Sequence, residues 1–119
     1  MAEIVALIDD IFFQAKLLET AKQVGVELRA FATPDALEAE IARTTPRLVV
    51  VDLNAASEPF KALERLQASG GKIPLIAFFS HVQVDLAKRA RAAGCSDVMP
   101  RSKFTQNLAT ILARAKSDS

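Results

Sequence analysis

The sequence predicts an α/β fold, a three-layer sandwich in which helices cover both faces of a five-stranded parallel sheet. Residues 48–51 are four consecutive aliphatic side chains, Leu-Val-Val-Val, which is typical of a strand buried on both faces. Short apolar runs of this kind alternate along the chain with segments of helical periodicity. Such alternation, with short connections, implies right-handed crossovers between parallel strands.

The predicted elements alternate strictly between strands and helices. In chain order they are a strand at 3–8, a helix at 11–24, a strand at 26–31, a helix at 34–43, a strand at 48–52, a helix at 60–69, a strand at 73–79, a helix at 82–93, a strand at 96–99 and a helix from 104 to 116.

The N-terminal elements follow from composition and periodicity. Residues 3–8 are mainly aliphatic, which favours a strand. Between 11 and 24 apolar side chains recur at helical spacing, and a glycine follows as a stop signal. Residues 26–31 alternate apolar and polar, as expected of a half-exposed strand. Thr33 as N-cap and Pro34 at the first helical position begin the second helix.

The C-terminal elements follow in the same way. In 60–69 apolar side chains share one helical face, and two glycines end the segment. The strand at 73–79 has its proline at an early position, where a strand tolerates it. Residues 82–93 are weakly amphipathic and precede a glycine. The short strand at 96–99 is followed by a predicted loop at 100–103.

The order of the strands follows from their exposure. The second strand alternates and therefore belongs at a rim, whereas the first and third strands are continuously apolar and belong in the centre. These placements favour the strand order 2-1-3-4-5, a flavodoxin-like arrangement whose sites lie beyond the carboxyl ends of the strands.

Length and composition set limits on the kind of protein. A chain of 119 residues fits one domain, residues 1–119. Half of the residues are hydrophobic and 24% are charged, which suits a packed core. The 15 basic and 14 acidic side chains nearly cancel, so the sequence predicts neither direct nucleic acid binding nor a membrane surface.

The redox and targeting signals point to the cytoplasm. The one cysteine, Cys95, excludes an intramolecular disulfide, and we expect it to be a small buried side chain in a reducing compartment. The N-terminus is acidic and lacks the pattern of a signal peptide. No apolar run reaches the ~20 residues that a bilayer span requires. We therefore expect a cytoplasmic protein.

Polar side chains follow several of the predicted strands. Asp9 and Asp10 come after the first strand, Asp52 ends the third, Ser80 follows the fourth and Arg101 follows the fifth. Because the first and third strands are predicted neighbours, their carboxylates meet at one edge of the sheet. Carboxylate and carbonyl oxygens are the ligands that Mg²⁺ prefers, and Mn²⁺ would suit the same site. Asp52, at the end of its strand, could alternatively turn the chain or cap the next helix.

At these residues the chain resembles the receiver domain of two-component response regulators. The resemblance covers essentially the whole length and consists of the pair Asp9-Asp10, Asp52 after an aliphatic strand, the hydroxyl of Ser80, and a basic residue before the last helix. Each motif is short, but their order and spacing on a five-fold β/α repeat make the combination fairly specific.

The resemblance implies a role for each matching residue. Asp52 would be phosphorylated by a histidine kinase or phosphotransfer protein, with Mg²⁺ held by Asp10, Asp52 and the backbone carbonyl of Asn54. Asp9 would hold the waters of the metal ion, and the hydroxyl of Ser80 would hydrogen-bond to the phosphoryl group. The cation of the last loop would pair with that group. Any enzymatic activity would then be at most self-catalysed aspartyl phosphorylation and dephosphorylation.

Three features depart from the family pattern. Arg101 stands where the family carries lysine, and a planar guanidinium prefers a fixed pair with a carboxylate. Lys103 is the alternative source of the cation. Val98 replaces the aromatic residue that switches inward in the family. The loop at 55–60 lacks the usual turn motif, and His81 beside Ser80 is a minor candidate for a catalytic base.

Two functional classes remain open. In the first, the chain is a stand-alone receiver, a Mg²⁺-dependent phosphoacceptor at Asp52 with atypical switching. In the second, it is a pseudo-receiver that is not phosphorylated and binds an effector protein, or a second copy of itself, through the fourth helix, fifth strand and fifth helix. A flavodoxin-like enzyme is disfavoured, because no phosphate-binding loop follows the first strand.

Overall fold

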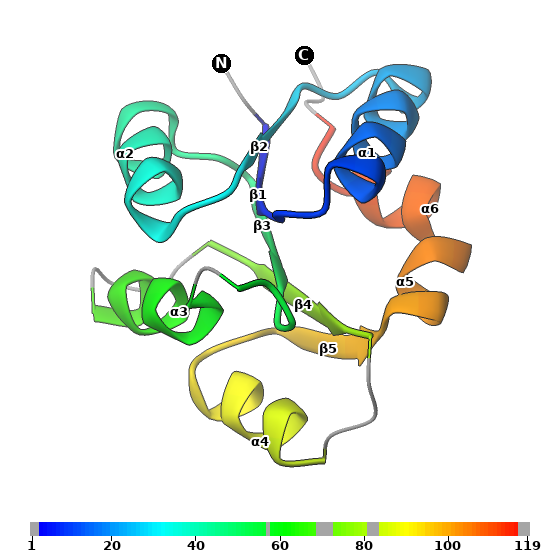
Figure 1. Cartoon of the computed structure of the whole chain (residues 1–119). Coiled ribbons are helices and arrows are strands. Elements are labelled where there is room, and N and C mark those ends of the chain that lie inside the picture. Colours follow the sequence, from blue (N-terminus) through cyan, green and yellow to red (C-terminus); the bar gives the residue numbers. More distant parts are fainter. Residues whose placement is uncertain (1–2, 57, 69–72, 81–83, 117–119) are drawn as a thin grey trace.

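The computed structural model describes residues 3–56, 58–68, 73–80 and 84–116, and these form one sheet with helices on both sides (Figure 1). The strands are β1 (Ile4–Leu7), β2 (Leu28–Phe31), β3 (Leu48–Asp52), β4 (Leu75–Phe79) and β5 (Asp97–Pro100). The helices are α1 (Ile11–Val24), α2 (Pro34–Thr44), α3 (Pro59–Ala68), α4 (Val84–Ala92), α5 (Arg101–Gln106) and α6 (Leu108–Ala113).

The sheet confirms the predicted topology. All neighbouring strands are parallel and their order is β2-β1-β3-β4-β5. In the pairing of β1 with β3, Leu7 lies opposite Val51, so both strands end at the same level of the sheet. The acids that follow them therefore share one edge, as the sequence predicted.

The core consists of two apolar layers, one on each face of the sheet. Successive residues of a strand point to opposite faces, so Val50 packs in the layer with α1, α5 and α6, and Val49 packs in the layer with α2, α3 and α4. All residues of β1 and β3 are buried because both faces are covered. The unbroken apolar run of β3 is explained by this double burial.

Cys95 lies in the second of these layers. Its side chain is buried, as expected from the sequence, and burial raises the pKa of its thiol to about 11. The neutral thiol is thus the stable form at physiological pH.

Helix α1 has a side-chain cap at its start and a glycine at its end. The carboxylate of Asp10 accepts hydrogen bonds from the backbone N–H groups of Phe12 and Phe13. Gly25 follows the helix with a φ of 82°, a left-handed conformation that glycine adopts without steric cost. The sequence predicted the glycine stop, but it suggested a helix cap for Asp52 rather than for Asp10.

The segment after β5 differs from the prediction. Residues 100–103 were expected to form a loop, but Pro100 is the last residue of β5 and Arg101 is the first residue of α5. The backbone of Pro100 is extended (φ −62°, ψ 150°), a conformation that suits both the end of a strand and an N-cap, so the helix begins without a connecting loop. The expected single helix is divided at Asn107, which lies between α5 and α6.

The expected bounds of α1 and β3 are confirmed, and most of the other boundaries shift by one to three residues. His81 and the beginning of the predicted fourth helix lie outside the described residues. None of the helices in the described ranges combines the length and apolar character needed to cross a bilayer.

Candidate functional site

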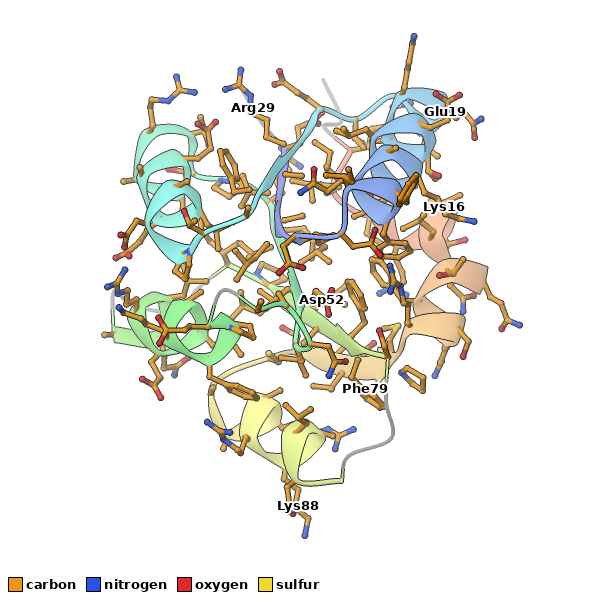
Figure 2. The ribbon with its side chains drawn as sticks, in the orientation of Figure 1. Lys16, Glu19, Arg29, Asp52, Phe79 and Lys88 are labelled. Atoms are coloured by element: carbon orange, nitrogen blue, oxygen red, sulfur yellow. The ribbon has the colours of Figure 1, made fainter. Side chains whose placement is uncertain are left out.

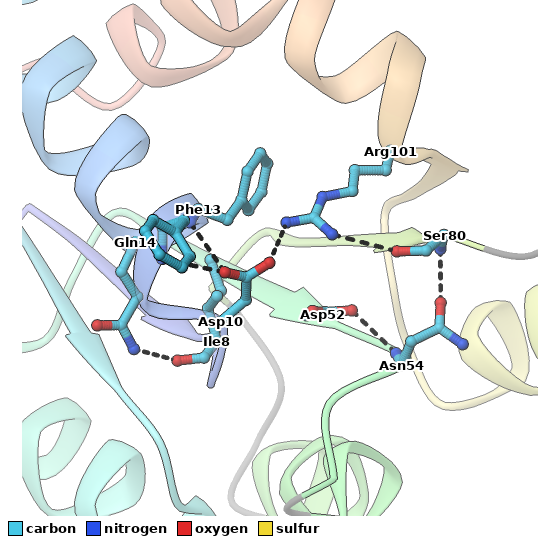
Figure 3. A network of polar contacts seen from close by, with 9 residues as sticks. Ile8, Asp10, Phe13, Gln14, Asp52, Asn54, Ser80 and Arg101 are labelled. Carbon is cyan, nitrogen blue, oxygen red and sulfur yellow. Dashed lines mark hydrogen bonds and ion pairs between the residues drawn. The ribbon is translucent and has the colours of Figure 1, made fainter.

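The predicted site residues gather at the carboxyl edge of the sheet, where Figure 3 shows Asp10, Asp52, Asn54, Ser80 and Arg101. Asp9 and Asp10 lie between β1 and α1, Asp52 is the last residue of β3, Ser80 directly follows β4 and Arg101 begins α5. Four strands that are neighbours in the sheet, β1, β3, β4 and β5, thus each contribute a polar group at their carboxyl ends.

Arg101 connects two of these groups. Its Nη2 donates to Oδ2 of Asp10 at 2.9 Å, and its Nη1 lies 3.4 Å from the hydroxyl oxygen of Ser80 (Figure 3). The side chains of Arg101 and Asp10 are 30% and 38% exposed, so water reaches this ion pair. The guanidinium therefore bridges the end of β1 to the end of β4.

An aromatic surface lies beneath the guanidinium. The Cζ atom of Arg101 is 4.0 Å from the ring centroid of Phe13 and 5.9 Å from that of Phe78. Phe78 in turn stacks on Phe104, with centroids 4.7 Å apart. A guanidinium over an aromatic face is attracted by the ring quadrupole, so the rings of the core fix the position of Arg101 above them.

The carboxylate of Asp10 has both oxygens engaged. Its Oδ1 accepts hydrogen bonds from the two N–H groups at the start of α1, and its Oδ2 accepts from Arg101. The hydrogen bond from Arg101, followed by that from the Phe13 backbone N–H, lowers the pKa of Asp10 below its ordinary range. Asp10 is thus held as an anion.

Asp52 is in a different environment. Its residue is 4% exposed, and its Oδ1 accepts a hydrogen bond from the backbone N–H of Asn54 at 2.9 Å. Figure 2 shows Asp52 in the interior of the view, whereas Lys16, Glu19 and Lys88 lie at the periphery. Burial raises the pKa of Asp52, although the Asn54 N–H and the charge of Arg101 oppose this change. The charges of Asp9 and Asp10 raise the same pKa further, so both neighbouring carboxylates act on Asp52.

Asp9 and Asn54 tie the loops around the site. Oδ2 of the exposed Asp9 accepts a hydrogen bond at 2.8 Å from the backbone N–H of Ala56, in the loop after β3. The side-chain oxygen of Asn54 accepts from the backbone N–H of Ser80 at 2.5 Å. The sequence predicted a role for the backbone carbonyl of Asn54 but missed this use of its side chain. An asparagine two residues after the acid was the available signal.

The chemical type of the available ligands suits a hard divalent cation. Three carboxylates and a backbone carbonyl are oxygen ligands of the type that Mg²⁺ and Mn²⁺ take, and their mutual repulsion would be relieved by a cation. As arranged, however, Asp10 is engaged by Arg101 and Asp9 by Ala56. Within the described ranges, no three acidic, histidine or cysteine side chains converge into a group that could hold a metal ion. A cation would thus require Asp10 to leave Arg101.

The remaining predicted features lie around this site. Lys103 is exposed in the first turn of α5, and its side chain makes no hydrogen bond or ion pair with any described residue. Arg101, rather than Lys103, is therefore the cation beside the acids. Val98 is 7% exposed and packs in the layer with α2, α3 and α4.

Solved structures with the same architecture were found by comparison, whereas no family model and no curated sequence matches the chain. The receiver domain of NtrX from Brucella abortus has a TM-score of 0.82 at 21% identity, over 98% of this chain and 99% of that one. A CheY-like response regulator receiver domain protein from Methanospirillum hungatei has a TM-score of 0.79 at 15% identity, over 97% and 96% of the two chains.

A third similar structure is the beryllofluoride-activated NtrC4 receiver domain dimer, with a TM-score of 0.79 at 14% identity over 98% of this chain and 100% of that one. The chain has the fold of a response regulator receiver domain. It spans 26% of the length of a longer NtrX structure, so in that protein this fold is one part of a larger chain. The resemblance inferred from the sequence is thus confirmed for the fold.

Proposed function

We propose that the chain is a receiver-type signalling module in which Asp52 accepts a phosphoryl group from a histidine kinase or phosphotransfer protein. In this proposal residues 1–119 act as one receiver-like domain that passes a change at Asp52 to an effector protein. The receiver fold supports the proposal, and so does the position of Asp52 at the end of a central strand.

The observation that carries the proposal is the bridge made by Arg101 beside Asp52. The guanidinium and the hydroxyl of Ser80 come from α5 and from the end of β4, and together they offer a positive charge and a hydrogen-bond donor. The charge of Arg101 acts on Asp52, since it partly offsets the rise in the pKa of that carboxyl that burial causes. Positive charge and donors at this position are what an incoming phosphoryl group requires.

The proposed reaction is a phosphoryl transfer to a carboxylate. An oxygen of ionised Asp52 forms a bond to phosphorus, and the bond from phosphorus to the leaving group of the donor breaks. The leaving group takes the bonding electron pair, so the charge is conserved. Arg101 and the Ser80 hydroxyl stabilise the phosphoryl oxygens as negative charge builds up on them.

A divalent cation would be held by Asp10, Asp52 and the backbone carbonyl of Asn54, with Asp9 orienting its waters. When bound, Mg²⁺ or Mn²⁺ supplies charge neutralisation that lets a carboxylate approach a phosphoryl group. The burial of Asp52 makes this neutralisation more important, because its ionised form is already disfavoured.

The test is phosphorylation of the full chain by a small-molecule phosphodonor with Mg²⁺, followed by intact mass and by amide resonances around Asp52 and Ser80. Wild type should gain one phosphoryl group, and beryllofluoride should shift the same resonances. Asp52→Asn should abolish both effects. Asp97→Asn, a change of the same kind at an exposed position in β5, is the control and should leave them intact.

The pseudo-receiver is the second candidate, and one observation favours it. Arg101 already neutralises Asp10, so this acid has a cationic partner without any ligand. In that case an effector protein or a second copy of the chain would bind the surface of α4, β5 and α5. Asp52→Ala would then leave partner binding unchanged, whereas charge reversal at the exposed Lys88 or Arg91 would weaken it.

A further inference from the structure

Arg101 is held by three different interactions at once. It pairs with Asp10, it contacts the hydroxyl of Ser80, and its guanidinium lies over the ring of Phe13 at 4.0 Å. Each interaction uses a different property of the guanidinium: the charge pairs with Asp10, a second N–H group points to Ser80, and the planar face lies on the ring of Phe13. A guanidinium anchored in this way has one preferred position.

We infer that Arg101 is the built-in cation of this site and competes with a divalent metal ion for Asp10, so that Arg101 determines how tightly the site binds metal. The inference deepens the proposed function and rests on it for the role of the metal. Arg101 is then the residue that sets the metal affinity of the site: removing Arg101 favours the metal-loaded site, and keeping it favours the metal-free one.

The competition follows from the oxygens of Asp10. The Oδ1 atom is committed to the cap of α1, and the Oδ2 atom is the partner of Arg101. A metal ion that takes Oδ2 must displace the guanidinium. It must also accept the repulsion of a positive charge that stays attached to Phe13 and Ser80 nearby.

Simple charge repulsion is the alternative explanation for weak metal binding, and Lys103 separates the two. Lys103 carries the same charge, lies in the same first turn of α5 and is exposed. Within the described part of the chain its side chain has no ion pair or hydrogen bond. Removing Lys103 therefore changes the net charge by the same amount without releasing Asp10.

The experiment is a titration of the full chain with Mn²⁺ alone, in which free Mn²⁺ is measured by electron paramagnetic resonance. Arg101→Ala should bind Mn²⁺ about 3- to 10-fold more tightly than wild type, because an exposed ion pair and one cation–π contact no longer oppose binding. Lys103→Ala should change the affinity by less than about twofold, since an exposed charge is screened by water and salt.

Arg101→Lys sharpens the result, because it keeps the charge but removes the planar group that reaches both Ser80 and the Phe13 ring. Its affinity for Mn²⁺ should lie between those of wild type and Arg101→Ala. Amide spectra should show that all three variants keep the wild-type fold.

The inference is overturned if Arg101→Ala binds Mn²⁺ no better than wild type, or if Lys103→Ala gains as much as Arg101→Ala. It is also overturned if Arg101→Lys matches wild type, because charge alone would then explain the effect. No phosphodonor is present in these titrations. Altered metal affinities with an unphosphorylated Asp52 would refute the proposed function alone, and unaltered affinities with a phosphorylated Asp52 would refute this inference alone.

Discussion

Asp10 and Asp52 follow neighbouring strands of one sheet, yet their environments shift their pKa values in opposite directions. The pKa of Asp10 is lowered, mainly by the hydrogen bond from Arg101. The pKa of Asp52 is raised, mainly by burial. At the same edge of the sheet, the ionised form is thus favoured for Asp10 and disfavoured for Asp52.

Partners and exposure, rather than residue type, cause the difference. Asp10 lies at the start of a helix, where backbone N–H groups and a guanidinium surround it, and its side chain is 38% exposed. Asp52 is 4% exposed and accepts a hydrogen bond from the backbone N–H of Asn54. The comparison assigns the two acids different tasks, since Asp10 anchors Arg101 and Asp52 is the carboxylate that gains most from a reaction or a ligand that removes its charge.

The largest expected effect comes from removing the ring of Phe78, which lies near the guanidinium that pairs with Asp10. Phe78→Ala should lower the free energy of unfolding by about 3–5 kcal/mol, because Phe78 is fully buried and a large-to-small change leaves a cavity. Its ring also packs against the rings of Phe104 and Phe13, and the guanidinium of Arg101 lies over the Phe13 ring. Urea denaturation measures the change.

A matched control for this prediction is Phe60→Ala in α3, on the opposite face of the sheet. Phe60 is half-buried with Arg89 over its ring, so its loss should cost less than half as much. Equal losses for the two variants would mean that the ring stack beneath Arg101 has no special weight.

The second effect concerns Asp52. Asp52→Asn should raise the free energy of unfolding at pH 7, without divalent ions, by about 1–2 kcal/mol, because a neutral amide avoids the cost of burying a charge. A raised pKa means that the folded state binds more protons than the unfolded state. The unfavourable contribution of Asp52 should therefore disappear as pH falls through the raised pKa towards the ordinary carboxyl pKa, and the variant should lack this gain.

Chemical denaturation between pH 4 and 7 would measure the Asp52 effect, with Asp97→Asn as the exposed control. A variant less stable than wild type at pH 7 would show that Asp52 is stabilised by its charge, which would remove the contrast with Asp10.

The smallest effect concerns Asp10. Asp10→Asn keeps a side chain able to cap α1 but removes the charge that pairs with Arg101, so stability at pH 7 should fall slightly. Because the pKa of Asp10 is lowered, its contribution to stability changes with pH in the opposite direction to that of Asp52. The contribution of Asp10 is present above the ordinary carboxyl pKa and is lost as pH falls through its lowered value.

Thermal melting at low and high salt checks the Asp10 prediction. The difference from wild type should shrink in about 1 M salt, where exposed charges are screened within about 3 Å. The Asp52→Asn difference should persist, because its cause is burial. A salt-independent loss for Asp10→Asn would indicate a structural role other than the ion pair.

Several features were predictable because they depend on residues close together in the sequence. The unbroken apolar run of β3, the spacing within α1 and the stop at Gly25 all express local periodicity. The alternation of β2 placed it at the rim, and the strand order followed. The prediction of a loop at 100–103 was wrong because α5 begins directly after Pro100 without a side-chain cap that would mark its start.

By itself the sequence determined the architecture and the edge of the sheet at which Asp9, Asp10, Asp52, Ser80 and Arg101 come together, because the ends of parallel strands are fixed once the strands are recognised. Only the tertiary structure decided that Arg101 pairs with Asp10, 91 positions away, and lies over Phe13. It also decided that burial has the largest influence on the pKa of Asp52, whereas the hydrogen bond from Arg101 has the largest influence on that of Asp10. Side-chain direction and access of water depend on every element packed around the site, and no local pattern in the sequence encodes them.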